Sequence, residues 1–176
     1  MRRPRCGAAL LAALASLVLV SGCGLTHLQD LQFRADTRLH FLAPKDRAQV
    51  HQPVTVSWTM RDFTAEAPGS APPSRTAGYF AVFVDSQPIH PGHTMKDVAT
   101  DTYCKHNPRC PDANYLAGKQ IYTTTKTSIK LPTIAVLSNH ETLQMHTITV
   151  VLMDTSGHRI GESAWELDVR IRKATF

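Results

Sequence analysis

Nitrogen and sulfur side chains gather in one long irregular stretch of the chain, residues 88–118. It contains His90, His93, Met95 and His106, together with two cysteines. Imidazole, thioether and thiolate groups are the ligands that copper(I) and zinc prefer in proteins. The stretch therefore predicts, as an alternative function, an envelope protein that binds copper or zinc through these residues.

The spacing of other reactive side chains argues against several kinds of catalytic site. After His140-Glu141, the position where a His-Glu-x-x-His zinc protease needs its second histidine is Gln144. The chain contains no Gly-x-Ser-x-Gly turn, glycine-rich phosphate loop or calcium loop. Three carboxylates near the C-terminus fit the solvated face of a strand better than a glycosidase pair: Glu162, Glu166 and Asp168. We predict a protein that is not an enzyme and needs no cofactor.

The N-terminal segment has the layout of a secretory signal. Three arginines within the first five residues precede an apolar run over 7–20, which is too short to be a permanent membrane span. The closing residues Val20-Ser21-Gly22-Cys23 resemble the lipobox of bacterial lipoproteins. The resemblance implies cleavage before Cys23 and lipid attachment to it. The mature chain would then be anchored in the cell membrane or outer membrane, on the extracytoplasmic side.

The remaining cysteines predict a disulfide. With Cys23 lipidated, Cys104 and Cys110 form an even pair in an oxidising compartment. The residues between them are polar and favour turns, so we expect a short surface loop closed by a disulfide. Such a bond leaves no thiolate for a metal, which makes metal binding the alternative rather than the main prediction.

The charge of the chain argues against nucleic acid as a partner. The formal net charge is +5, and it falls when the three arginines of the leader are removed. The remaining lysines and arginines are dispersed and form no basic stripe interleaved with aromatic residues. They are typical of an ordinary solvated surface.

Alternating apolar and polar residues predict β-strands over most of the remaining chain. The clearest covers 52–60, where Val54, Val56 and Trp58 alternate with hydroxyl-bearing residues. The run 78–85 is apolar on both faces, which predicts a central strand covered on both sides or partly by a loop. We expect further strands at the end of 33–43, over 120–131 as one bent strand or two short ones, and over 146–154 and 163–172. Short helices are expected at 95–100 and 111–117.

The order of these strands carries a second resemblance. The proline turn and Val-x-Val strand at 42–58, the strand 81–85 and the His-x-Ile-x-Val run 146–154 resemble bacterial immunoglobulin-like or fibronectin-III-like domains. The resemblance spans 39–171 and implies an all-β fold. The implied fold is a single immunoglobulin-like antiparallel β-sandwich with a long disulfide-pinned loop insertion. The domain order would be a lipoprotein signal peptide (1–22), a lipidated tether (23–36) and the immunoglobulin-like domain (37–176).

We predict a non-catalytic, membrane-anchored binding or structural module of the cell envelope. Its partners would be the membrane, through the lipid on Cys23, and an unknown envelope protein or glycan. Binding residues are expected on loops, because a rigid scaffold presents its loops to partners. The first choice is 88–118, where Tyr103 and Tyr115 are amphipathic contact residues. Packing of both rings onto the domain is the other role open to them.

Overall fold

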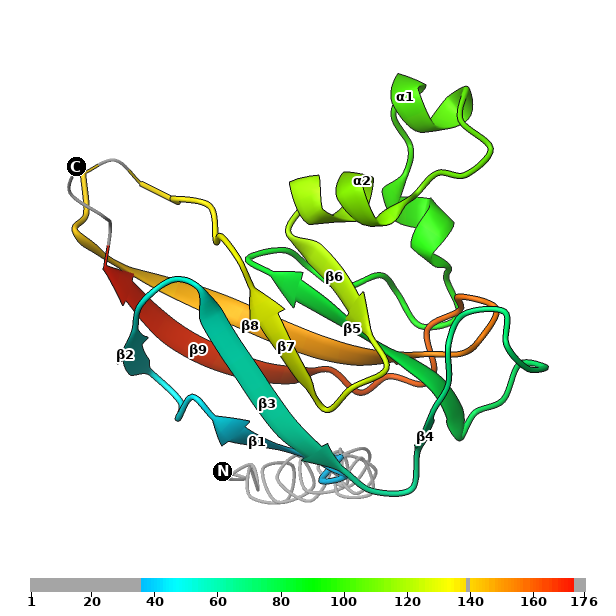
Figure 1. Cartoon of the computed structure of the whole chain (residues 1–176), viewed down its shortest axis with the longest axis horizontal. Coiled ribbons are helices and arrows are strands. Elements are labelled where there is room, and N and C mark those ends of the chain that lie inside the picture. Colours follow the sequence, from blue (N-terminus) through cyan, green and yellow to red (C-terminus); the bar gives the residue numbers. More distant parts are fainter. Residues whose placement is uncertain (1–35, 139, 173–176) are drawn as a thin grey trace, which may run out of the picture. The chain divides into compact units, whose positions relative to one another are not determined.

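The computed structural model describes residues 36–138 and 140–172 (Figure 1). The signal peptide, Cys23 and residues 24–35 of the tether lie outside the described residues, as do 139 and 173–176. The strands are β1 (Leu39–Ala43), β2 (Ala48–Val50), β3 (Val54–Met60), β4 (Thr64–Ala65), β5 (Ala77–Val84), β6 (Ile121–Thr124), β7 (Ser128–Leu131), β8 (Leu143–Met153) and β9 (Trp165–Arg172). The helical segments are η1 (Met95–Val98), α1 (Thr102–Lys105) and α2 (Ala113–Gly118). Among these residues, no helix has the length and apolarity needed to cross a membrane.

The smaller of two sheets contains β1, β3 and β7, all antiparallel, with β3 in the middle. Its register places Trp58 opposite Phe41 and Val54 opposite Leu131. Valines and Trp58 of β3 are buried while Thr55 is exposed, as the alternation predicts. This sheet therefore presents one continuous apolar face.

The larger sheet has the order β2–β9–β8–β5–β4, and β6 also pairs with β5. Antiparallel β9, β8 and β5 form its centre, with Val150 opposite both Trp165 and Val82. At the edges, β2 runs parallel to β9 and β4 runs parallel to β5. The expectation of a purely antiparallel arrangement is therefore wrong at these two edges. Alternation reports which face of a strand is buried and carries no information about the direction of its neighbour.

A hydrophobic core lies between the two sheets. It is formed mainly by inward-facing side chains of β3, β5, β8 and β9. Trp58 packs edge-on against Phe80, with their ring centroids 5.3 Å apart. Leu39 and Leu131 extend the core into the outer strands of the smaller sheet. Burial of this apolar surface is the main contribution to the stability of the fold. The two sheets confirm the predicted all-β class.

β5 is buried on both faces, as its continuous apolar sequence predicts. The face turned away from the smaller sheet forms a second core with Met95 of η1 and Leu116 of α2. The segment 85–120, green in Figure 1, covers this face. We refer to it as the insertion. It contains three helical segments where the sequence predicted two, because α1 is a single turn and too short to produce a helical periodicity.

The stretch 120–131 forms two short strands that belong to different sheets. β6 pairs with β5 in the larger sheet, and β7 pairs with β3 in the smaller one. The chain therefore changes sheets between Thr124 and Ser128. The sequence also missed β2 and β4, since strands of three and two residues are too short to show alternation.

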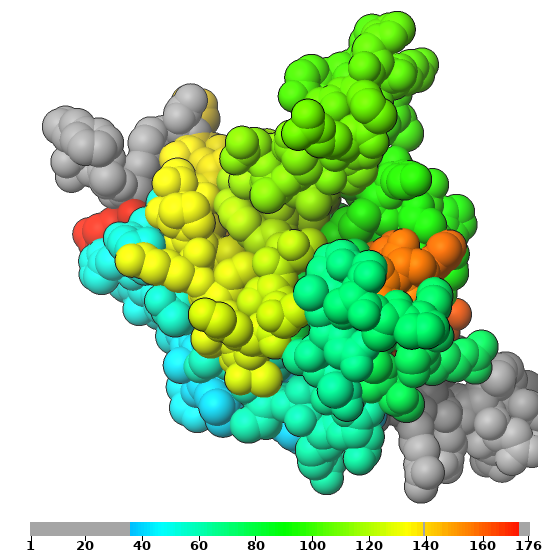
Figure 2. All heavy atoms as spheres, turned by 45° about the vertical axis from the view of Figure 1, so that its right-hand side comes forward, coloured from blue at the N-terminus to red at the C-terminus, as the bar shows by residue number. Residues whose placement is uncertain are grey.

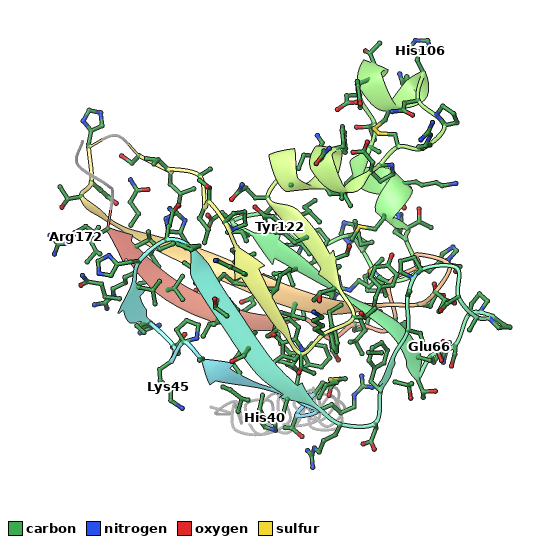
Figure 3. All side chains as sticks on the ribbon, in the orientation of Figure 1. His40, Lys45, Glu66, His106, Tyr122 and Arg172 are labelled. Carbon is green, nitrogen blue, oxygen red and sulfur yellow. A yellow bond between two sulfur atoms is a disulfide. The ribbon has the colours of Figure 1, made fainter. Side chains whose placement is uncertain are left out.

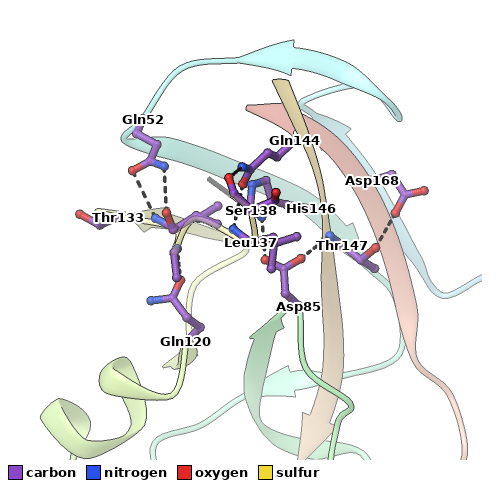
Figure 4. Close-up of polar contacts among 12 residues, drawn as sticks. Gln52, Asp85, Gln120, Thr133, Leu137, Ser138, Gln144, His146, Thr147 and Asp168 are labelled. Carbon is purple, nitrogen blue, oxygen red and sulfur yellow. Dashed lines mark hydrogen bonds and ion pairs between the residues drawn. The ribbon is translucent and has the colours of Figure 1, made fainter. Parts of the chain in front are cut away.

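Polar side chains hold the connection from β7 to β8 (Figure 4). The amide of Gln52 exchanges two hydrogen bonds with the backbone of Ile134, at 3.0 and 3.3 Å. Gln144 accepts a hydrogen bond of 2.8 Å from a backbone N–H of the same connection. Nearby, Nδ1 of the buried His146 lies 2.7 Å from a carboxylate oxygen of Asp85. These contacts replace the backbone pairing that an irregular connection lacks.

Asp36 ties the start of the described chain to β9, and this contact predicts a dependence of stability on pH. Its carboxylate accepts hydrogen bonds from the guanidinium of Arg38 and from Ser163 Oγ, and its carbonyl accepts one of 2.7 Å from Trp165 Nε1. The hydrogen bond from Arg38 holds the pKa of Asp36 well below its ordinary value. A carboxylate with a lowered pKa stabilises the fold above its unfolded pKa of about 4, and this contribution is lost as the pH falls below that value.

Asp36→Asn is therefore expected to lower the free energy of unfolding by about 1 kcal/mol near neutral pH, after allowance for the partial exposure of the pair. The difference from the unmodified protein should shrink as the pH is lowered below about 4. Urea unfolding at several pH values measures it. Glu166→Gln, at an exposed position of β9, is the control. An equal and pH-independent loss in both variants would contradict the role given to Asp36.

Candidate functional site

A disulfide closes the outer part of the insertion. Cys104 and Cys110 are bonded, with their Cα atoms 5.1 Å apart, which confirms the predicted pair. The short helices α1 and α2 each begin at an aspartate: the carboxylate of Asp101 accepts a hydrogen bond from the backbone N–H of Cys104, and that of Asp112 accepts one from Tyr115. These caps satisfy backbone donors that an isolated helical turn leaves free.

The structure brings the two predicted contact tyrosines together. The rings of Tyr103 and Tyr115 are parallel, with centroids 6.0 Å apart. Tyr115 packs on the second core, its hydroxyl donates a 2.6 Å hydrogen bond to Asp101, and Lys119 lies 5.0 Å from its ring centroid. That hydrogen bond is also the main cause of the lowered pKa of Asp101. Tyr115 thus organises the insertion, while Tyr103 remains 60% exposed on its surface.

The predicted metal ligands are divided between different surroundings. Met95 is buried in the second core, and both cysteine sulfurs are used in the disulfide. The rings of His90 and His93 lie 5.8 Å apart, and His93 Nδ1 lies 3.4 Å from Asp97. His106 follows α1 at the tip of the insertion (Figure 3). In 36–138 and 140–172, no three His, Cys, Asp or Glu side chains are grouped as metal ligands.

A cleft of about 440 Å³ opens where the insertion meets the turn after β8. Its walls come from the start of η1 with its cap (94–96), the disulfide loop (108–111) and the turn 155–158, together with Pro68 and, at the base, the buried Tyr79. Figure 2 shows the orange turn beside the green insertion and the teal loop that precedes β5. A second hollow of about 280 Å³ adjoins it, shares Pro68 and Tyr79, and is otherwise lined by 123–126. We call the two hollows together the Tyr79 cleft.

Tyr79 is the polar side chain at the base of this cleft. It is only 4% exposed, yet it lines both hollows. Burial raises its pKa to about 12, with a further contribution from the charge of Asp154. Its hydroxyl forms no hydrogen bond with any described residue, so it points into the cleft as a protonated group with unused hydrogen-bonding capacity. Any Cβ placed on Gly157 would lie 3.5 Å from that hydroxyl.

The turn that closes the cleft is shaped by Asp154. One of its carboxylate oxygens accepts hydrogen bonds from the backbone N–H groups of Ser156 and His158 and from Ser156 Oγ. Gly157 completes the turn with φ +87°, a conformation in which a glycine is favoured. Asp154 is therefore turned into the backbone of the loop and does not line the Tyr79 cleft.

The charged side chains that line the Tyr79 cleft are all cationic or basic. Lys96 and Arg109 lie in the larger hollow with His158, and Lys126 lies in the smaller one. No aspartate or glutamate of the described chain lines either hollow. The three cations form no ion pair with a described residue. The charged groups that line the cleft are therefore positive or basic, and the donor at its base is neutral.

A neighbouring hollow of about 580 Å³ has a different character. Arg159 lines it and is 8% exposed, and its guanidinium donates hydrogen bonds to the carbonyl oxygens of Ile89, Glu162 and Ser163. Burial lowers the pKa of Arg159. The same hollow is also lined by Asp154 and Glu162, so its charge is mixed. Arg159 therefore joins the segment around Ile89 to its own segment, 159–163.

As contact residues, the sequence singled out Tyr103 and Tyr115 on the insertion, neither of which lines the Tyr79 cleft. It assigned Tyr79 to a buried strand, which is correct, but gave no role to its hydroxyl. The available signal was a single tyrosine inside an otherwise apolar run. Lys96 and Arg109 belong to the predicted loop 88–118, but they were read as ordinary surface charges. The loop 65–77 is held to the turn after β8 by a hydrogen bond from Gly69 N–H to Thr155 O, and its Pro68 lines the cleft.

Tyr79, three cations and several hydroxyl groups surround a space of the size that holds a small molecule. A scan against models of protein families, a search of curated proteins and a search of solved structures found no match to this chain.

Proposed function

We propose that this chain is a non-catalytic, lipid-anchored binding module on the extracytoplasmic side of a bacterial membrane. Cys23 carries the lipid, and the two-sheet body presents the insertion to a ligand or partner in the cell envelope. The disulfide between Cys104 and Cys110 carries this proposal, because such bonds persist mainly in oxidising compartments outside the cytoplasm. It stands beside the Tyr79 cleft and stiffens one of its walls, since residues 108–111 line the larger hollow.

We assign the body to the immunoglobulin-like class. The packing of two sheets around Trp58 supports the assignment, as does the antiparallel pairing of the last two long strands, β8 and β9. The parallel pairs at β2 and β4 are departures from the simplest arrangement of that class. The insertion between β5 and β6 is the part that distinguishes this chain, and it forms one side of the cleft.

Substitution of Cys23 tests the anchoring. Cys23→Ala is expected to abolish lipid attachment, so the protein either accumulates unprocessed or leaves the membrane fraction. Two or more acyl chains hold a protein on a membrane stably, and removal of all of them removes that binding. Membrane fractionation of the host cells and mass spectrometry of the N-terminus measure the two effects.

Cys6→Ala is the matched control, because Cys6 lies within the predicted leader and would be removed with it. This variant should keep the mass and membrane location of the unmodified protein. A Cys23→Ala protein that stays in the membrane fraction at the normal mass would contradict the anchoring. Free thiols on Cys104 and Cys110 in protein from untreated cells would contradict the extracytoplasmic location.

A further inference from the structure

The Tyr79 cleft has the features of a site for a negatively charged ligand. Lys96, Arg109 and Lys126 reach it from three separate segments, and no carboxylate of the described chain lines it. In contrast to these three, Arg38 pairs with Asp36 at 2.8 Å, and Lys119 lies 3.7 Å from Asp101. An anion placed among the three cations would gain charge-assisted hydrogen bonds, and Asp154, whose charge reaches the Tyr79 hydroxyl, is the nearby carboxylate that opposes it.

The base of the cleft adds a second, independent observation. Tyr79 is more than nine-tenths buried, and its hydroxyl faces the cleft without a hydrogen-bond partner among the described residues. Among these residues, the fully buried side-chain atoms without a partner are Trp58 Nε1 and Arg159 Nε, so the Tyr79 hydroxyl is open to solvent. A polar atom of a ligand would take the place of that solvent at the base of the cleft.

The other residues that line the cleft indicate what the uncharged part of the ligand would be. Hydroxyl-bearing residues flank Tyr79 on both sides, with Thr123 and Thr125 exposed in the smaller hollow. Pro68, Pro108 and Pro111 supply rigid apolar walls that lose little conformational entropy on binding. Volumes of about 440 and 280 Å³ match one or two sugar rings better than an extended polymer.

We infer that the Tyr79 cleft binds an acidic mono- or disaccharide, with its carboxylate or phosphate group between Lys96 and Arg109 and a ring hydroxyl on Tyr79. The inference rests on the proposed function, since it takes the domain to be a binding module. Lys126 would contact the second ring in the smaller hollow. Carboxylate and phosphate share the charge and the acceptor oxygens that the site needs.

Calorimetric titration of the full chain in a non-ionic detergent tests the inference. The probes are glucuronic acid, glucose 6-phosphate and uncharged glucose. One or both acids should bind, and glucose should bind at least about tenfold more weakly. The acid that binds better identifies the charged group. Failure of both acids to bind, or equal binding of glucose, would overturn the inference.

Variants distinguish the cleft from general attraction to a basic protein. The double variant Lys96→Gln/Arg109→Gln should raise Kd at least about tenfold, because it removes two charge-assisted contacts. Lys45→Gln/Lys130→Gln removes the same charge at exposed positions outside the cleft and should leave Kd unchanged. Equal effects of the two double variants would reject the site.

Tyr79→Phe keeps the buried ring and removes only the hydroxyl, so it should bind more weakly while its thermal transition stays in place. Unchanged binding in this variant would remove Tyr79 from the site.

If no acidic sugar binds, the proposed anchoring through Cys23 is unaffected, because fractionation of the Cys23→Ala protein tests it separately. Conversely, a protein that proves not to be lipidated can still be titrated with the same probes.

Discussion

Replacing Gly78 with alanine is expected to lower the free energy of unfolding by roughly 3–5 kcal/mol. Gly78 lies near the start of β5 with φ +151°, which L side chains rarely adopt. A Cβ there would lie 2.0 Å from the carbonyl oxygen of Met153 and 2.8 Å from Asp154 Cα. Both are backbone atoms at the end of β8, and they cannot move away without disturbing the pairing of Tyr79 with Met153. Urea unfolding followed by circular dichroism measures the loss.

Gly118→Ala is the matched control for this substitution. Gly118 ends α2, and no atom lies within 4 Å of the position that its Cβ would take. Its stability should change by less than about 1 kcal/mol. Because Gly78 precedes Tyr79, the Gly78→Ala protein should also bind an acidic sugar more weakly. Equal stability of the two alanine variants would show that β5 does not approach the turn as closely as described.

Trp58→Ala is expected to lower the free energy of unfolding by about 3–5 kcal/mol. Trp58 is 1% exposed and lies at the centre of the core between the sheets, edge-on to Phe80. Removal of the indole leaves a large cavity, because the backbones of both sheets are held by their own hydrogen bonds and cannot close around it. Chemical denaturation of purified protein gives the value.

Trp58→Phe separates packing from hydrogen bonding. The indole N–H of Trp58 has no partner among the described residues, so its removal leaves nothing unsatisfied. We expect this variant to lose about 1.5 kcal/mol or less. Trp165→Phe provides the contrast, since the Trp165 N–H donates a 2.7 Å hydrogen bond to the Asp36 carbonyl. A Trp58→Phe protein as unstable as Trp58→Ala would contradict the packing described between the sheets.

The strands that the sequence predicted well are those with long and regular patterns. β3, β5 and β9 each have at least seven residues, and their alternation or continuous apolarity reflects which faces are buried. This pattern does not depend on the neighbouring strands, because side chains alternate along a strand regardless of its pairing partner. Strand direction is different: β2 and β4 run parallel to their neighbours, and no local feature records this.

The insertion also combines features that follow from local sequence with features that depend on the whole fold. Its cysteine pair lies close together in sequence, so local rules predict it. The sequence also indicates that Met95 and Leu116 are buried, since large apolar side chains usually are. Their burial against the outer face of β5 depends on that face being left free by the smaller sheet, which is a property of the whole fold.

By itself, the sequence determined the all-β class, the principal strands and the cysteine pair, because periodic burial and short-range spacing are local properties. The Tyr79 cleft was decided only by the tertiary structure. Its groups are separated by long stretches of chain, from Pro68 through Lys96, Arg109 and Lys126 to His158. Taken singly, each is an ordinary surface side chain. They become one positively charged site because packing on both faces of β5 brings the insertion, the β6–β7 turn and the turn after β8 to the same end of the strand.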